Sequence, residues 1–184
     1  MPNTTANYRH EAVALTPMSA MGRQYLIASA LLIAVALPTS PATADRVAGP
    51  LRFFEGRTEI VSLVKVVMKK PYRSRTLGQG SIAPDGTLSL VQQVKEDGKP
   101  PHQRQWRIRQ VGPGSFSGTM SEAVGPVQVQ ELGGKFRFRF RMKGNLAVEQ
   151  WVTPLPGGRS AESRITVRKL GMRVASSEGR IRKL

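Results

Sequence analysis

The sequence predicts an all-β protein, an antiparallel up-and-down meander of about eight to ten strands that closes into a barrel after an N-terminal signal peptide. The first observation is a strict alternation of apolar and basic residues from Lys135 to Lys143. The second is a series of Gly- and Pro-containing turn signals every 10–20 residues, which suits hairpins and leaves little room for crossover helices. The third is that no segment after residue 45 has the 3.6-residue period of an amphipathic helix.

The N-terminal part of the chain has the three features of a secretory signal peptide. Arg23 precedes an uncharged apolar run of twelve residues, Leu26 to Leu37, and Ala42 and Ala44 then form an A-x-A site. This order predicts a signal peptide over residues 18–44, cleaved after Ala44. Twelve apolar residues fall short of the roughly 20 that span a bilayer, so an uncleaved anchor and a buried helix are the weaker alternatives.

Residues 1–17 are polar and irregular, unlike the start of a signal peptide. We therefore expect them to be a non-native upstream extension, with the true start at Met18 or Met21. The mature protein is then a single barrel domain over residues 45–184, located in the periplasm or secreted. The chain has no Cys, so a lipid anchor on cysteine is excluded.

The predicted elements follow one another along this domain. The Gly- and Pro-rich stretch 45–59 contains Phe53-Phe54 and is expected to form a lid or lead-in that closes one mouth. The next segment is apolar on both faces, as expected for a strand between two layers or under a terminal segment. It covers residues 60–68. Shorter stretches in which apolar and polar residues alternate with a period of two lie at 88–94, 106–109, 127–130, 164–168 and 172–174.

The strand at 135–143 shows the pattern most clearly, because a period of two gives a strand one buried and one solvated face. A packed sandwich is the alternative architecture, but consecutive hairpins close most simply as a barrel, which leaves no open edge. The residues expected to face inward are Phe136, Phe138, Phe140 and Met142, and those expected to face water are Lys135, Arg137, Arg139, Arg141 and Lys143.

The composition argues against most enzyme classes. The absence of Cys excludes disulfides, thiolate metal sites and a Cys nucleophile, and His102 is the only histidine after residue 45. No G-x-S-x-G turn, phosphate-binding loop or dinucleotide motif occurs. We predict no catalytic residue, metal or cofactor, and keep a hydrolase or isomerase that uses Glu96 or Glu149 as the weakest hypothesis.

The basic surface is the strongest electrostatic signal. The chain has 28 Lys and Arg against 12 Asp and Glu, a net charge of +16, which attracts anionic surfaces or simply keeps the protein soluble. Export argues against nucleic acid as the partner, and aromatic side chains on the opposite face from the cations cannot stack on bases. The residues predicted to bind an anionic surface are Arg107, Arg109, Arg137, Arg139, Arg141 and Lys143.

Polar residues also occupy inward positions. Gln92, Arg104 and Gln150 each share the inward face of a strand with apolar neighbours. An unpaired buried polar group costs roughly 1–3 kcal/mol, so these side chains either bond one another near a rim or bind the polar part of a ligand. The predicted ligand-binding residues are Gln92, Arg104, Trp106, Phe138, Phe140 and Gln150, with Arg104 as the partner of an anionic headgroup.

The order of several short motifs is familiar. They are FFEGRT at 53–58, GTLSL at 86–90, EDG at 96–98 followed by R-x-W at 104–106, GxFxGT at 114–119, EQW at 149–151 and LGM at 170–172. Over residues 51–184 the chain resembles a domain-of-unknown-function family of proteobacterial envelope proteins, often lipoproteins, with a lipocalin-like barrel. The resemblance implies the barrel and the envelope location and supplies no activity. The chain departs from the family in lacking the lipid-bearing Cys and in having Glu149-Gln150 where two acidic residues are expected.

Two functions therefore remain open, for a chain that we expect to be a monomer. The first is a barrel that binds a small apolar or amphipathic ligand, one with an anionic, lipid-like headgroup included. The second is a non-catalytic envelope protein that docks on an anionic membrane or lipopolysaccharide through its basic outer surface. An internal cavity separates them, because small barrels fill with side chains and larger ones hold ligands.

Overall fold

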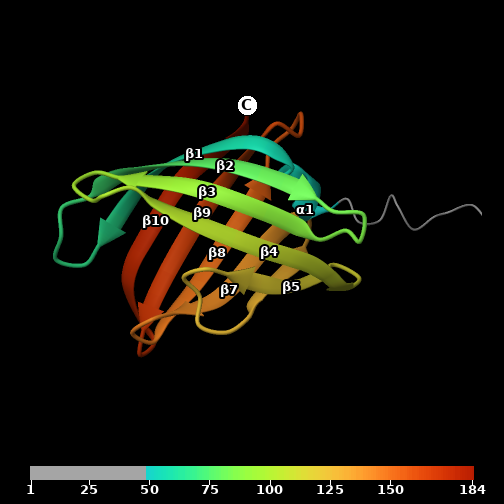
Figure 1. Cartoon of the computed structure of the whole chain (residues 1–184). Helices are drawn as coiled ribbons and strands as arrows, with labels where there is room; N and C mark the ends of the chain where they lie inside the picture. The colour runs from blue at the N-terminus through green and yellow to red at the C-terminus, as the bar shows by residue number, and fades with distance from the viewer. Residues whose placement is uncertain (1–48) are drawn as a thin grey trace, which may run out of the picture. The chain divides into compact units, whose positions relative to one another are not determined.

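The computed structural model describes residues 49–184, which form a closed antiparallel barrel after one helical turn (Figure 1). Each strand pairs with its neighbours in sequence, and the first and last strands pair with each other, Ile60 opposite Ile181. The predicted barrel is confirmed, and the sandwich alternative is wrong. The elements are α1 (Pro50–Phe53), β1 (Gly56–Val66), β2 (Tyr72–Ile82), β3 (Leu88–Glu96), β4 (His102–Gly112), β5 (Ser115–Met120), β6 (Val127–Leu132), β7 (Lys135–Met142), β8 (Leu146–Pro154), β9 (Ser160–Lys169) and β10 (Met172–Lys183).

The signal peptide predicted at 18–44, its cleavage site and the segment 1–17 all lie outside the described residues. Within residues 49–184, no helix is long and apolar enough to cross a membrane.

The alternation in β7 places the side chains as predicted, with two corrections. Phe136 and Phe138 are buried and Arg139 and Arg141 are exposed. Phe140, however, is only half-buried, because β7 reaches the open end of the barrel there. Arg137 is also half-buried rather than solvated.

The burial of Arg137 comes from the neighbouring strand. Trp151 lies directly opposite it on β8, and the guanidinium carbon sits 5.6 Å from the centre of the indole ring. This is the geometry of a cation–π contact. The guanidinium also donates a hydrogen bond to Gln130 on β6. An aromatic side chain therefore does lie among the outward cations, contrary to the expectation of a purely basic outer face.

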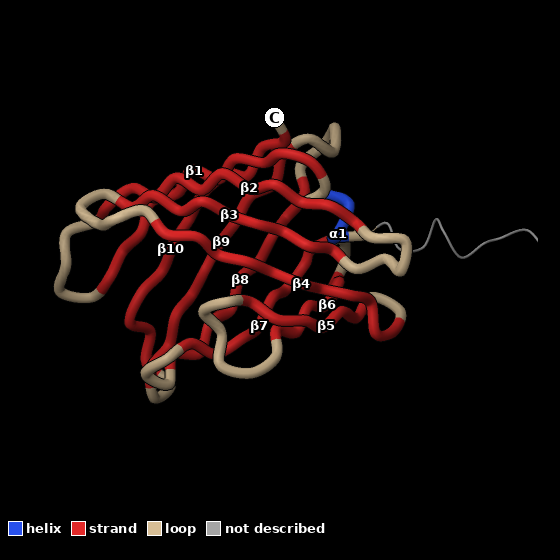
Figure 2. Tube along the Cα trace, viewed as in Figure 1, coloured by secondary structure: helices blue, strands red, loops and turns tan. Residues whose placement is uncertain are grey.

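The ends of the barrel differ because the meander runs strictly up and down. Odd-numbered strands run away from α1, so five connecting loops gather at the end opposite the helix (Figure 2). We call these loops, with the strand residues that adjoin them, the open rim. The loops are 67–71, 97–101, 121–126, 143–145 and 170–171.

The other end is closed by α1, which lies within the lead-in predicted at 45–59, although residues 56–59 of that stretch already belong to β1. Pro50 begins the helix, where its missing N–H is not needed. Leu51 is fully buried, and Phe54 packs edge-on against Phe138 with ring centres 6.2 Å apart. Gly80 of β2 lets the helix approach, since a Cβ there would lie 2.0 Å from the carbonyl oxygen of Phe54.

Residues 60–66 of the segment predicted to be apolar on both faces belong to β1, whereas Val67 and Met68 lie in the loop that follows it. The inward residues of β1 join the interior, but Val61 and Leu63 point outward and are 45% and 43% exposed. Within residues 49–184 no second layer covers them, so the strand does not lie between two layers of the barrel; an N-terminal segment that would cover it lies outside the described residues.

The seam between the first and last strands is held by a charge cluster. The carboxylate of Glu59 on β1 accepts hydrogen bonds from Arg182 on β10 and Arg75 on β2, both at 2.7 Å. These bonds, that from Arg182 first, lower the pKa of Glu59 below its ordinary value. The cluster ties three strands together at the point where the barrel closes.

Candidate functional site

The barrel contains an internal cavity of about 220 Å³ between α1 and the open rim. Leu51 and Phe54 of the helix line its closed end, and Met142 and Val167 line it where β7 and β9 approach the rim. All six residues predicted to bind a ligand line this cavity: Gln92, Arg104, Trp106, Phe138, Phe140 and Gln150. The period-two reasoning therefore assigned each of them to the correct face.

One side of the cavity is aromatic. Trp106 of β4 lies between two rings of β7, with its centre 6.4 Å from that of Phe138 and 5.7 Å from that of Phe140. Both contacts are edge-to-face, the arrangement that aromatic pairs favour. Leu88 and Leu90 of β3 extend this surface toward the end of the barrel that α1 closes, which we call the plugged end.

The side formed by β1, β2, β9 and β10 is rich in hydroxyl groups, and we call it the hydroxyl wall. Its hydroxyl residues are Ser62, Ser74, Thr76, Ser163, Ser176 and Ser177, interspersed with aliphatic residues. Ser74 and Thr76 are each only 8% exposed and make no side-chain hydrogen bond to another residue of the described barrel. Hydroxyl groups that line a cavity without a protein partner are available to a ligand or to water.

The inward glutamines are held by partners within the barrel. Trp106 Nε1 donates a hydrogen bond to Gln92 Oε1 at 2.8 Å, and Gln150 Nε2 donates to Ser163 Oγ at 3.0 Å. The first bond fixes the indole ring against Gln92, and both residues line the cavity. The sequence analysis left open that the inward polar side chains bond one another. The structure shows such a hydrogen bond for one polar atom of each glutamine amide.

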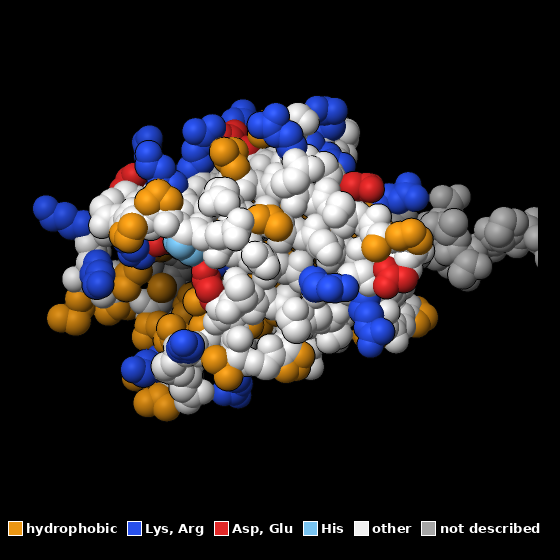
Figure 3. All heavy atoms as spheres, in the orientation of Figure 1, with side chains coloured by type: hydrophobic (Ala, Val, Ile, Leu, Met, Phe, Trp, Pro, Cys, Tyr) orange, Lys and Arg blue, Asp and Glu red, His pale blue; other side chains and the backbone are white. Residues whose placement is uncertain are grey.

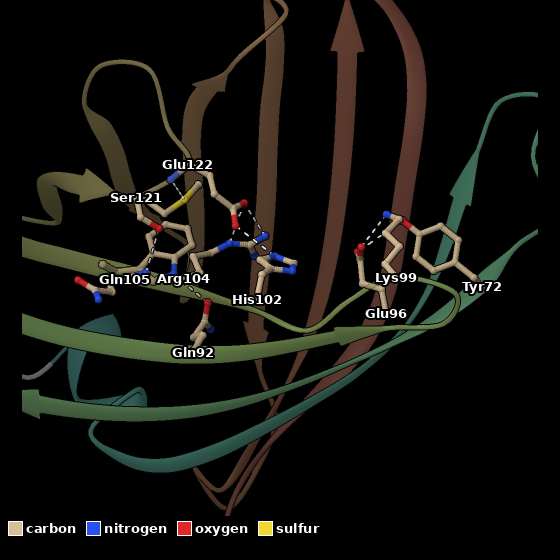
Figure 4. Close-up of polar contacts among 11 residues, drawn as sticks. Tyr72, Gln92, Glu96, Lys99, His102, Arg104, Gln105, Ser121 and Glu122 are labelled. Atoms are coloured by element: carbon tan, nitrogen blue, oxygen red, sulfur yellow. Dashed lines mark hydrogen bonds and ion pairs between the residues drawn. The ribbon is translucent and has the colours of Figure 1, made fainter.

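Arg104 lies at the mouth of the cavity and already has a carboxylate partner. Its Nε and Nη2 donate to one oxygen of Glu122, at 3.1 and 2.8 Å, while His102 Nε2 lies 3.1 Å from the other oxygen (Figure 4). The charge predicted to bind an anionic headgroup is thus compensated by Glu122. An anionic ligand would have to compete with that carboxylate.

A second polar cluster lies at the mouth, where Lys99 of the β3–β4 loop meets the end of β3 and the start of β2. Lys99 Nζ donates to Glu96 at 2.6 Å and to Tyr72 at 3.0 Å (Figure 4). The bond to Glu96, followed by that to Tyr72, raises the pKa of Lys99 above its ordinary value. Glu96 also lines the cavity, so its carboxylate is fixed where a ligand would enter.

Sequence reasoning missed Glu122, Tyr72 and the hydroxyl wall. Glu122 and Tyr72 could not be found, since their partners are distant in sequence and meet through strand pairing. The hydroxyl wall left a signal in residues 72–82, where Ser74, Thr76 and Gly78 occupy alternate positions and must share one face.

The carboxylates of the enzyme hypothesis lie on different faces. Glu96 faces the cavity and is paired with Lys99, whereas Glu149 is on the outer side of β8 and accepts a hydrogen bond from Trp151 at 3.2 Å. Glu149 therefore cannot act on a molecule inside the barrel. Among residues 49–184, no group of three or more His, Asp or Glu could hold a metal ion.

The predicted anion-binding residues do not form one surface. Arg107 and Arg109 are exposed on β4, while Arg139, Arg141 and Lys143 are exposed on β7 and the loop after it. Strands β5 and β6 separate the two groups. Arg137 is held against Trp151, as described above.

Comparisons with known proteins identify the fold. No protein-family model matches the sequence, and no curated protein matches it. One similar solved structure is the S-type phycobiliprotein lyase CPES from Guillardia theta, with a TM-score of 0.59 and 6% identity over 73% of this chain and 90% of that one. Another is Rv2717c from M. tuberculosis, with a TM-score of 0.55 and 13% identity over 75% of this chain and 97% of that one. At these identities the likeness concerns the fold alone, and the chain has a lipocalin-like β-barrel.

Proposed function

We propose that this chain is an exported barrel that binds one small apolar or amphipathic molecule. The observation that carries the proposal is a cavity plugged at one end, open at the other, and lined by an aromatic side and a hydroxyl wall. Small-ligand sites are built in this way, from apolar surface with a few convergent polar groups. The comparison with a phycobiliprotein lyase adds only that a barrel of this shape serves a protein named as an enzyme.

The volume limits the ligand. A cavity of 220 Å³ has room for about seven waters at roughly 30 Å³ each, and lies below the roughly 300–1,000 Å³ of sites for drug-sized molecules. The ligand is therefore small, or it buries one end in the barrel and leaves the rest at the rim.

The two sides of the cavity define the chemistry of the ligand. A ring or alkyl segment would pack against Trp106 and Phe138, while a hydroxyl, ether or carbonyl group would bond Ser74 or Thr76. Because Glu122 compensates Arg104, an uncharged polar group fits this site better than an anionic headgroup.

Export remains part of the proposal, and it is supported by the A-x-A site after the short apolar run. Docking on an anionic membrane is the second candidate function. The observation in its favour is the run of exposed cations along β7 toward the open rim, namely Arg139, Arg141 and Lys143.

A fluorescence titration tests ligand binding. The chain has two tryptophans, so Trp151→Phe leaves Trp106 of the cavity as the single reporter. We expect the neutral probe phenylnaphthylamine to quench it, and anilinonaphthalene sulfonate, which is anionic, to bind more weakly. Ser74→Phe fills the cavity and should abolish quenching, whereas Arg73→Phe, one residue earlier and outward-facing, should not.

The outcomes separate the alternatives. Equal quenching in the cavity-filling and control variants would show that the probe binds elsewhere and would contradict the proposal. If the proposal holds, native mass spectrometry of protein from the producing cell should also show a bound small molecule that the Ser74→Phe variant lacks.

A further inference from the structure

The open rim carries most of the strongly exposed apolar side chains of the barrel. Seven large apolar residues in the described part of the chain are more than half exposed, and five of them lie on this rim. Met68 is 99% exposed and Leu170 is 77% exposed, at the tips of the β1–β2 and β9–β10 loops. The other three are Val67, Val124 and Met172. Figure 3 shows hydrophobic side chains gathered at the left end of the view, with Lys and Arg around them.

The backbone holds the two most exposed tips in an unfavourable conformation. Met68 has φ 61° and Leu170 has φ 49°, in the left-handed region that a bulky side chain rarely adopts. Glycine is the residue ordinarily found at such positions, because it has no Cβ. Both loop tips therefore carry a large side chain at a position where the backbone conformation favours glycine. Strained residues of this kind cluster at functional surfaces.

On the rim of the described barrel, the acidic side chains have hydrogen-bond or ion-pair partners, whereas the cations beside the apolar tips do not. Its acidic residues Glu96 and Glu122 are bound by their own partners at the mouth, and Asp97 accepts the backbone N–H of Arg73. The cations beside the apolar tips form no ion pair with any carboxylate of the described barrel. They are Lys69, Lys70, Lys143, Lys169 and Arg173.

We propose that the open rim is a docking surface for an anionic lipid bilayer, with the apolar tips inserted among the headgroups and the cations on the phosphates. Exposed apolar side chains next to unpaired cations combine the two contributions that bind a protein to an anionic membrane interface, buried apolar area and attraction to the lipid charge. A protein partner fits less well, since protein interfaces are depleted in lysine and enriched in aromatic residues. The inference differs from docking through the outer wall, because the wall cations are split between β4 and β7.

Rim docking places the mouth of the cavity against the bilayer. The β1–β2 loop adjoins β10, since Val67 N–H donates to the carbonyl of Val174 at 3.0 Å, so its tip stands beside the hydroxyl wall. A lipid-derived ligand could then pass between bilayer and cavity without crossing water. This last step alone rests on the proposed ligand-binding function, while the docking itself does not.

The test is flotation of the chain, as its producing cell processes it, with phosphatidylcholine vesicles that contain or lack phosphatidylglycerol. We expect binding only to the anionic vesicles, and weaker binding as the Debye length falls from ~30 Å at 0.01 M to ~8 Å at 0.15 M salt. All variants share the residues outside the barrel, so differences between them report the barrel.

The decisive variant is Met68→Gly with Leu170→Gly. It removes both apolar tips and relieves both backbone strains, so the protein should melt at the same or a higher temperature while vesicle binding falls at least about tenfold. Val111→Ser is the control for loss of an exposed apolar side chain elsewhere, because Val111 is 59% exposed but lies near the end that α1 closes. This control should bind like the wild type.

Charge reversal gives a second, independent variant. Lys69→Glu with Lys70→Glu on the rim should abolish binding, and Arg107→Glu with Arg109→Glu on the wall should not. Failure of the wild type to bind at 0.01 M salt would overturn the proposal, as would loss of binding only in the wall variant. Probe quenching of Trp106 should survive in the double-glycine variant. If the probe quenched Trp106 in none of the proteins, the ligand-binding function would be refuted and the docking proposal would be unaffected.

Discussion

Truncation of Phe138 to alanine should lower the free energy of unfolding by about 3–5 kcal/mol. The ring is 5% exposed and connects the plug to the cavity wall, through edge-on contacts with Phe54 and Trp106. Phe140, two residues further along β7, is only half-buried, and its ring packs edge-on against that of Trp106.

The magnitude follows from two contributions. Loss of a buried phenyl ring from the interior costs about 1.5–3 kcal/mol in transfer free energy. Removal of the ring opens roughly 100 Å³ of further cavity, which at ~24 cal/mol per Å³ adds about 2.4 kcal/mol. The barrel cannot collapse onto this space, since every strand is paired on both sides. The two contributions together come to about 3.9–5.4 kcal/mol, which covers the upper half of the expected range and slightly exceeds it.

Urea titration followed by tryptophan fluorescence measures the effect, with Arg139→Ala as the control. Arg139 is the next residue on the same strand but faces water, so its truncation should stay within about 0.5 kcal/mol. A loss for Phe138→Ala no larger than that of the control, or the reverse order, would refute the strand registry and the packing of the plug.

Three further outcomes are expected. Gly80→Ala should destabilise the barrel and raise proteolysis at α1, because the new methyl group meets the Phe54 carbonyl, and unchanged cleavage would show that the helix is not packed there. The pKa of Glu59 is lowered in the folded state, so its contribution to stability is complete above its ordinary value near 4.5 and is lost as the pH falls through the folded value. The urea midpoint of Glu59→Gln should therefore lie below that of the wild type at pH 7 and converge on it in acid, whereas a constant difference would contradict this. N-terminal sequencing of the exported protein should find Asp45 first, and a mature chain that retains residues 26–37 would contradict the predicted cleavage.

The sequence alone determined the class of the fold and the face of each predicted site residue. The reason is that a period of two is a local property of every strand, and turn residues mark where one strand ends and the next begins. The inward assignment of Gln92, Arg104 and Trp106 needed only their apolar neighbours in the same strand, and the structure agrees with it. The half-burial of Arg137 was not accessible in this way, because Trp151 comes from another strand.

The tertiary structure alone decided which residues meet across the barrel. Closure pairs β1 with β10 and brings Glu59 to Arg182, 123 residues away, in a register that depends on every intervening hairpin. The same closure creates the hydroxyl wall, since Ser62 and Ser177 lie on strands from opposite ends of the domain. It also gathers Met68 and Leu170 at one rim, although the sequence predicted Met68 as the end of an apolar strand and did not relate it to Leu170. Strand pairing is non-local, so its consequences for the cavity and the rim follow from the closed sheet and not from the pattern of any single segment.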